Sequence, residues 1–202
     1  MTIYIAHRQN DLKRVKYKNN SFFDGIEIDV RSDSKNIILN HDPFKKSLIL
    51  FKNLKKFEKF FLIIDVKSTG ICRKIYNVLK KKHKKFLFLN LIQSEFIDMV
   101  QKGYGGNLML RFSSYENFNL KNKNFKKIKW IWFDFFDKHF ISPREFTYLK
   151  KFKKKICLTS PDLLGFKTGL VKKYIKYLKK NKIKVDMVCA KKKNINIWKK
   201  FY

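Results

Sequence analysis

Residues 61–66, F-L-I-I-D-V, and residues 86–91, F-L-F-L-N-L, decide the fold class of this chain. Both runs are apolar on the two faces that a strand would present, which is typical of strands in a parallel sheet covered by helices. Similar runs recur along the chain, at residues 2–7, 25–30, 107–111, 129–134, 155–159 and 184–189. The pattern predicts eight buried strands in a chain of 202 residues.

Segments with helical spacing follow most of these strands. After Gly165, an apolar stripe of Leu170, Tyr174 and Leu178 is flanked by lysines that would face water, which predicts an amphipathic helix. Further helices are expected at residues 69–83, 93–102, 142–152 and 192–201. The connections after the first two strands look irregular.

Strand and helix alternate along the whole chain, which indicates an α/β fold, a (β/α)8 TIM barrel, rather than a sandwich or a bundle. Such barrels typically need about 250 residues. A barrel of 202 residues must therefore be compact, with short connections. No Pro- or Gly-rich linker divides the sequence, so we expect a single domain over residues 1–202.

The formal net charge is +32, from 48 basic and 16 acidic residues. Only six of the basic residues are Arg, whereas surfaces that recognise phosphate geometry favour the bidentate guanidinium. The excess is Lys, and it accompanies abundant Asn, Ile and Phe, as an A/T-rich coding genome would produce. A nucleic-acid role is therefore not favoured, although so positive a field should attract anionic substrates and surfaces.

The cysteines and the N-terminus bear on the compartment. Cys72, Cys157 and Cys189 lie far apart with no C-x-x-C pair, so neither a disulfide framework nor a zinc knuckle is indicated. The first residues run directly into a strand pattern without the features of a signal peptide. No apolar run approaches the roughly 20 residues that span a bilayer. We expect a cytoplasmic protein.

Acidic side chains gather at the ends of the second and third predicted strands. Glu27 and Asp29 are two residues apart on a strand, so they point to the same face, and Asp65 and Lys67 repeat this geometry. In a barrel that face is the interior, where carboxylates are costly to bury unless they are paired or bind a cation. Three convergent oxygens would suit Mg²⁺ or Ca²⁺. The alternative is that these acids form structural salt bridges with Lys67 and Arg8.

Two of the four histidines, His7 and His41, follow strand ends beside these acids. Two imidazoles flanking a bound phosphate could supply the base and the acid that phosphodiester cleavage requires. His83, in a run of lysines, and His139 are expected to be ordinary structural or surface residues. The candidate chemistry is therefore concentrated in the first third of the chain.

The same segments resemble a known family. I-A-H-R-Q-N at 5–10, G-I-E-I-D-V-R-S-D at 25–33 and I-L-N-H-D at 38–42 are similar to the signature of the glycerophosphodiester phosphodiesterases, which is H-R, then E-x-D, then H-D. I-I-D-V-K at 63–67 is similar to the family's following E-x-K motif. The likeness is strong over residues 3–67 and weaker beyond them.

This resemblance implies a barrel phosphodiesterase that releases glycerol phosphate and an alcohol, through attack by the neighbouring glycerol hydroxyl and a cyclic phosphate intermediate. It implies that a divalent ion, Mg²⁺ or Ca²⁺, is held by Glu27, Asp29 and Asp65. It also implies that His7 and His41 are the catalytic acid/base pair.

Substrate contacts are expected around the same rim of the barrel. The resemblance implies that Arg8 and Lys67 contact phosphate oxygens. Among polar residues at later strand ends, Arg111 is the best candidate, because a guanidinium can grip phosphate. The other candidates at those strand ends are Asn90, Gln93, Asp134 and Ser160. Trp130 and Trp132 alternate with apolar neighbours and are expected to be core residues.

The chain departs from the family pattern in three ways. Asp65 stands where Glu is usual, and Gln9 stands where Gly commonly follows H-R. Only 22 residues, 43–64, separate Asp42 from Asp65, too few for the insertion that many relatives carry after the second strand. We therefore expect a pocket that is open on this side and suits a large anionic diester, either phospholipid-derived or glycan-linked. Peripheral contact with an anionic membrane or a glycan would fit such a rim.

Two other interpretations remain open. Asp65 also makes the chain similar to the phospholipase D-type toxins, which would predict a phospholipase D-like phospholyase. A catalytically inert basic barrel that binds anionic surfaces or nucleic acid is the other alternative. The sequence does not indicate the oligomeric state.

Overall fold

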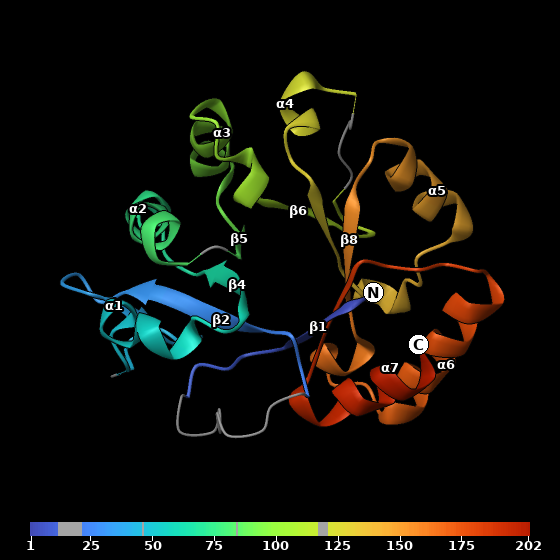
Figure 1. Cartoon of the computed structure of the whole chain (residues 1–202). Helices are drawn as coiled ribbons and strands as arrows, with labels where there is room; N and C mark the ends of the chain where they lie inside the picture. The colour runs from blue at the N-terminus through green and yellow to red at the C-terminus, as the bar shows by residue number, and fades with distance from the viewer. Residues whose placement is uncertain (12–21, 46, 84, 117–120) are drawn as a thin grey trace.

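Eight parallel strands form a nearly closed barrel, with the helices arranged around its outside (Figure 1). The structure is a computed structural model that describes residues 1–11, 22–45, 47–83, 85–116 and 121–202. Around the barrel the strand order is β5-β4-β2-β1-β9-β8-β7-β6. The bounds of these strands are β1 Ile3–Ala6, β2 Gly25–Ser32, β4 Phe61–Val66, β5 Phe86–Leu89, β6 Met109–Phe112, β7 Trp130–Phe133, β8 Lys155–Thr159 and β9 Met187–Ala190. Across the remaining seam, β5 and β6 are joined by an isolated parallel bridge between Phe88 and Leu108.

Helices cover the outside of the strands. The α-helices are α1 Leu50–Asn53, α2 Cys72–Lys82, α3 Gln93–Gln101, α4 Lys123–Lys126, α5 Pro143–Lys151, α6 Thr168–Lys180 and α7 Ile195–Phe201. Short 3-10 helices are η1 Leu54–Phe57, η2 Gly105–Asn107, η3 Phe136–Lys138, η4 Pro161–Leu164 and η5 Lys192–Asn194. Within the described part of the chain, none of these helices has the length and apolar character needed to cross a bilayer.

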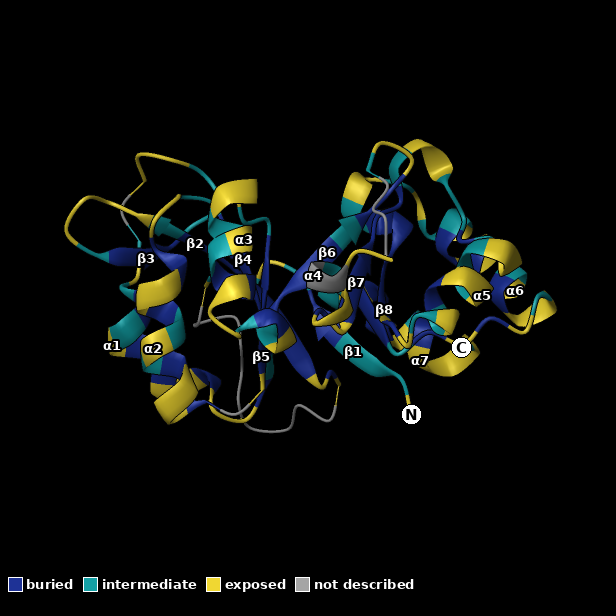
Figure 2. Cartoon of the chain, turned by 90° about the horizontal axis from the view of Figure 1, so that it is seen from above, coloured by how far each residue is buried: buried dark blue, intermediate teal, exposed yellow. Residues whose placement is uncertain are grey.

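Two apolar layers hold the barrel together, one on each face of the strands. The strands are largely buried, whereas exposed residues lie mainly on helices and loops (Figure 2). On β2, the alternate residues Ile26, Ile28 and Val30 face outward and pack in the layer beneath the helices. The inner layer is smaller and consists of Ile5, Ile63, Leu87, Leu89, Met109, Trp130, Trp132, Cys157, Met187 and Cys189. The prediction that the two tryptophans are core residues is confirmed. Because a strand alternates its side chains, the outward isoleucines on β2 direct Glu27 and Asp29 to the barrel interior.

Local sequence explains how the covering helices begin and which face they bury. At the start of α5, the Ser142 hydroxyl accepts a hydrogen bond from the backbone of Glu145, whose carboxylate accepts one from the Ser142 backbone, a capping box with Pro143 in the first turn. On α6, the predicted apolar stripe is confirmed, because its members Tyr174 and Leu178 are fully buried. The capping box thus anchors the start of α5, and the apolar face predicted from the sequence anchors α6.

The eight predicted strands are all present, with shifted ends. The last strand was expected at 184–189 and lies at Met187–Ala190. The carboxylate of Asp186 accepts a hydrogen bond from the Ile156 backbone N–H, so a side chain takes the place of a strand carbonyl there. The connection after the first strand falls largely within residues 12–21, outside the described residues.

The connection after β2 is more ordered than the sequence indicated. Residues 37–39 form strand β3, Ile37–Leu39, which pairs antiparallel with β2. The turn between them is closed by the Asp33 carboxylate, which accepts hydrogen bonds from the backbone N–H groups of Lys35 and Asn36. This β2-β3 hairpin was not predicted, and it determines where His41 lies.

Gly25 is expected to be essential for strand packing, because a Cβ atom there would collide with the Phe61 carbonyl and the Ile5 side chain. The Gly25→Ala substitution should lower the free energy of unfolding by about 1–3 kcal/mol, measured by urea denaturation. Gly169, in α6, has open space around it and is the control. Gly169→Ala should change stability by at most about 1 kcal/mol, in the stabilising direction. Equal effects of the two substitutions would contradict this packing argument.

Candidate metal centre and active site

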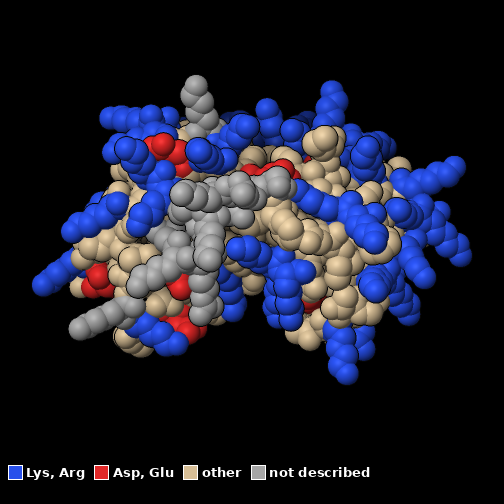
Figure 3. All heavy atoms as spheres, turned by 60° about the horizontal axis from the view of Figure 1, so that its bottom comes forward, with Lys and Arg blue, Asp and Glu red and all other residues tan. Residues whose placement is uncertain are grey.

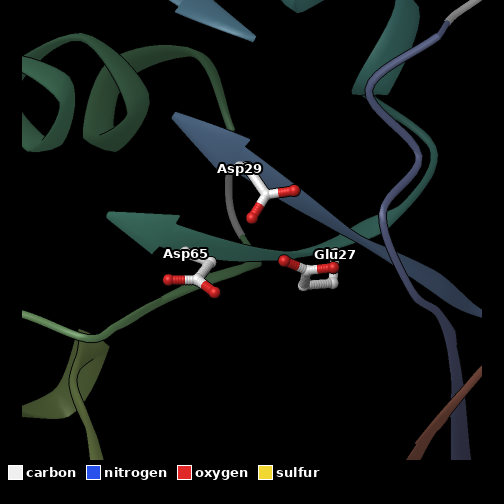
Figure 4. A group of neighbouring side chains, drawn as sticks. All are labelled: Glu27, Asp29 and Asp65. Carbon is white, nitrogen blue, oxygen red and sulfur yellow. The ribbon is translucent and has the colours of Figure 1, made fainter. Parts of the chain in front are cut away.

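Three buried carboxylates meet at the carboxyl ends of β2 and β4 (Figure 4). Asp29 and Asp65 are direct partners in the parallel ladder, so they stand at the same level on neighbouring strands. Glu27 lies two residues earlier on the same face, and its longer side chain reaches toward the same space. One oxygen from each residue lies within 4.8 Å of the others. The structure therefore brings together the three predicted metal ligands.

Two asparagines hold two of these carboxylates in place. The Asn10 side-chain amide donates to Asp29 Oδ2 at 2.8 Å, and its oxygen accepts from the Asp29 backbone N–H, also at 2.8 Å. Asn90 Nδ2 donates to Asp65 Oδ1 at 2.7 Å. Asn90 has a φ of +62°, in the left-handed region that Asn tolerates better than most residues. Asn90, predicted as a substrate contact, thus orients a candidate metal ligand.

The charge of the three acids is only partly balanced by protein groups. Lys67 Nζ lies 2.6 Å from Asp65 Oδ2 and 3.5 Å from Asp29 Oδ1, so the salt bridge expected for Lys67 is present. Glu27 Oε1 and Asp29 Oδ1 are buried and accept no hydrogen bond from the described residues. Burial, followed by the charges of Asp29 and Asp65, raises the pKa of Glu27 well above its ordinary value. One ammonium group does not balance the charge of three buried carboxylates. The two oxygens that accept no hydrogen bond are of the kind that a hard divalent cation prefers as ligands.

His7 lies against this cluster. Its Nε2 atom is 3.6 Å from Glu27 Oε2, and the same Glu27 oxygen accepts the Arg8 backbone N–H at 2.6 Å. Burial, with the charges of Arg8 and Lys67 and smaller contributions including His41, lowers the pKa of His7 to about 3. The imidazole of His7 is therefore neutral at neutral pH and able to accept a proton.

The β2-β3 hairpin positions His41. Arg31, near the end of β2, donates from Nε to the His41 carbonyl at 2.9 Å and from Nη1 to the Lys67 carbonyl at 3.2 Å. One guanidinium thus ties together the two segments that carry His41 and Lys67. Arg31 was not predicted as a site residue. Its position two residues after Asp29 on the same strand would have placed its side chain on the same face as the acids.

The hydrogen bonds of His41 define its tautomer. Arg8 Nη2 lies 2.6 Å from His41 Nε2, and a guanidinium can only donate, so Nε2 carries the lone pair. The proton is then on Nδ1, which donates to Asp42 Oδ1 at 2.9 Å. The hydrogen bonds from His41 and Lys45 lower the pKa of Asp42 to about 2. Asp42 is therefore ionised and orients the ring.

Arg111 lies at the rim on β6, within an ion-pair cluster. Its Nε atom is 2.7 Å from Asp134 Oδ2 and 3.7 Å from Glu116 Oε2. Trp132 Nε1 donates to Asp134 Oδ1 at 3.0 Å. Burial raises the pKa of Asp134 to about 6, against the opposing effects of Arg111 and Trp132. The phosphate contact expected for Arg111 remains a prediction.

The other histidines and strand-end candidates have structural surroundings. His83 bonds the Phe60 carbonyl, and His139 pairs with Glu145 at 2.8 Å, as ordinary structural residues do. Ser160 is completely buried, and its hydroxyl accepts from Trp198 Nε1 at 2.9 Å, so its prediction as a substrate contact was wrong.

Lys191, which follows β9, was not predicted as a site residue, although its charge contributes to the low pKa of His7. In the sequence it is hidden in a run of three lysines.

The fold and the site together define a (β/α)8 barrel with an acidic centre where barrel enzymes place their chemistry. Two solved structures share this fold. A glycerophosphoryl diester phosphodiesterase from Parabacteroides distasonis ATCC 8503 matches with a TM-score of 0.68 at 11% identity, over 98% of this chain and 85% of that chain. A glycerophosphodiester phosphodiesterase from Agrobacterium tumefaciens str. C58 matches with a TM-score of 0.62 at 12% identity, over 99% and 100%.

The comparisons confirm the resemblance at the level of the fold. Identity of 11–12% carries no information on the substrate or the metal. No protein-family profile matches the sequence, and no curated protein has significant sequence similarity to it. The roles of individual residues therefore depend on the geometry of this site.

Removal of one acid should separate metal binding from folding. Asp29→Asn relieves repulsion among three buried carboxylates, so without divalent ions the variant should be at least as stable as the native protein. Mg²⁺ or Ca²⁺ should raise the Tm of the native protein over that in EDTA, and should leave the Tm of the variant unchanged. Asp98→Asn, which removes an exposed partner of Lys102, should keep the full ion-dependent shift. An undiminished shift in Asp29→Asn would rule out this metal site.

The raised pKa of Asp134 predicts a pH-dependent stability. Between about pH 4 and about pH 6, the Asp134 carboxyl keeps its proton in the native state and loses it in the unfolded chain. The protonated carboxyl therefore stabilises the native state at low pH, and this contribution to the free energy of unfolding is lost as pH rises through about 6. Asp134→Asn should therefore be more stable than the native protein at pH 7–8, by about 1–2 kcal/mol, and equally stable below about pH 4. Chemical denaturation across this pH range measures the difference. Glu116→Gln, at the exposed side of the same cluster, is the control, and a pH-independent difference for Asp134→Asn would contradict the assignment.

Proposed function

We propose that this chain is a metal-dependent phosphodiesterase that hydrolyses a glycerophosphodiester to glycerol phosphate and an alcohol. The observation that carries the proposal is the cluster of Glu27, Asp29 and Asp65, with His7 against it and with buried oxygens that accept no hydrogen bond from the described residues. The two compared structures that share this fold are named as glycerophosphodiester phosphodiesterases, which agrees with the proposal.

The proposed centre holds Mg²⁺ or Ca²⁺ on Glu27, Asp29 and Asp65, and the ion would stabilise negative charge on the phosphate. Lys67 and Arg8 contact phosphate oxygens. A phosphate that draws the Arg8 guanidinium away from His41 frees the Nε2 lone pair of that ring. Substrate binding then exposes a proton acceptor that the free protein keeps engaged.

Two proton transfers follow from the two imidazoles. One ring takes the proton from the glycerol hydroxyl next to the ester, and that oxygen attacks phosphorus while the bond from phosphorus to the alcohol oxygen breaks. The other ring must be protonated in the substrate complex, where the negative phosphate favours an imidazolium, and it gives that proton to the departing alcohol oxygen. Water then opens the cyclic phosphate to glycerol phosphate. Asp42 keeps Nδ1 of His41 protonated, so that Nε2 is the atom that exchanges protons.

The substrate side of the site is open. A cavity of about 630 Å³ lies beside the β2-β3 hairpin and is lined in part by Arg31, Pro43, Phe44 and Lys45. Phe44 is fully exposed next to Lys45, which supports peripheral contact with an anionic membrane or a glycan. A diester that is phospholipid-derived or glycan-linked would fit such a rim, and both possibilities remain predictions.

A catalytically inert basic barrel is the main alternative. If the barrel bound nucleic acid, its lysines should gather on one face. Exposed lysines instead occur on α2, α5, α6 and α7, and they spread over the face seen in Figure 3. This distribution speaks against a dedicated nucleic-acid surface. A phospholipase D-like phospholyase would use the same centre, and it differs in leaving a cyclic phosphate as the final product.

The catalytic histidines are tested by His7→Ala and His41→Ala. Each should lower kcat on glycerophosphocholine by at least about 100-fold, because each removes a proton-transfer group. EDTA should abolish the native activity. Circular dichroism should show both variants folded, since neither ring fills the apolar core.

His139→Ala is the matched control, because His139 pairs with Glu145 away from the acids. It should retain native turnover. Full activity in either catalytic variant, or no metal-dependent turnover of any diester by the native protein, would overturn the proposed function.

A further inference from the structure

A second cavity, of about 470 Å³, opens beside the metal centre between α3 and the loop after β6. This volume lies within the range of roughly 300–1,000 Å³ that is usual for small-molecule sites. Its walls are mostly apolar, from Leu91, Phe96, Ile97, Met109, Leu110 and Phe125. It lies at the seam of the barrel, where β5 and β6 are joined by the isolated bridge between Phe88 and Leu108.

This cavity is next to the acidic centre. Asn90 lines the cavity, and its Nδ2 atom donates to Asp65 Oδ1 at 2.7 Å. One side chain therefore separates the apolar wall from a candidate metal ligand. Arg111 lines the cavity too, and its ion pair with Asp134 places a charged group at the apolar wall.

The cavity and the histidines lie on opposite sides of the acids. In the strand order β5-β4-β2-β1, Asp65 is on β4, His7 follows β1, and the cavity begins beyond β5. A phosphodiester has two ester arms that leave phosphorus in different directions. With phosphorus held at the acids, both ester oxygens stay beside it, near the imidazoles, and the carbon chain of one arm can extend toward this cavity.

We propose that this cavity binds the alcohol arm of the substrate, and that this alcohol is apolar, an alkyl or aryl group. The inference rests on the proposed function. Glycerol carries hydroxyls that need hydrogen-bond partners, which the Leu, Ile, Met and Phe side chains that form most of this wall do not supply. The polar residues in the lining are Asn90, Gln93, Arg111, Tyr115 and Glu116, and of these Asn90, Arg111 and Glu116 are already engaged in hydrogen bonds or ion pairs. An apolar alcohol instead gains free energy by leaving water in this cavity. Ile97 is 43% exposed here, so part of the apolar wall is available to a ligand.

The first test is binding of hexyl phosphate and inorganic phosphate in Mg²⁺, by isothermal titration calorimetry. Hexyl phosphate should bind the native protein at least about tenfold more tightly than inorganic phosphate, because its alkyl chain is buried. Ile97→Asn should reduce this preference to below about threefold. Ile92→Asn, which changes an exposed isoleucine next to α3 that does not line the cavity, should keep the full preference.

Turnover separates this inference from the proposed function. The native protein should have a higher kcat/KM for glycerophosphohexanol than for glycerophosphocholine, and Ile97→Asn should lower the ratio of the two values. Metal-dependent turnover of both diesters without any hexyl preference in binding or turnover would overturn the inference and leave the function standing. A hexyl preference that Ile97→Asn removes, without turnover of any diester, would keep the binding site and overturn the function. An equal loss of preference in Ile92→Asn would also overturn the inference.

Discussion

Mutual repulsion among three carboxylates in the barrel interior is the constraint on which the rest of the site depends. Glu27, Asp29 and Asp65 are held together by the register of two parallel strands, in surroundings that solvate charge poorly. Among the described residues, the Lys67 ammonium lies against Asp65, and the Asn90 amide donates a hydrogen bond to the same carboxylate. Protons or a cation must balance the remaining charge in such an arrangement, and this requirement is the physical argument for the proposed cation.

The groups around the acids act mainly as orienting partners. Asn10 and Asn90 each direct a carboxylate oxygen, and Arg31 ties the backbone of His41 to that of Lys67. Functional groups need supporting hydrogen bonds of this kind to stay within a narrow range of geometry. The outer partners come from several different strand ends, so the site is assembled by the closure of the barrel.

The seam between β5 and β6 distinguishes this small barrel. Elsewhere neighbouring strands pair at two or more positions, whereas here a single isolated bridge joins the strands and an apolar cavity lies beside the acidic centre. A compact chain with short connections thus combines a polar centre, built on the best-paired strands, with an apolar site at its least-paired edge.

The sequence by itself determined the barrel and most of its chemical residues. Apolar runs set the eight strands, and the two-residue repeat of a strand placed Glu27 and Asp29 on one face. Only the tertiary structure decided the hairpin that positions His41, the role of Arg31, the burial of Ser160 and the cavity at the seam. The reason is physical: strand period and apolarity are local properties, whereas hydrogen bonds, buried charge and cavities depend on residues that are far apart in the chain until it folds.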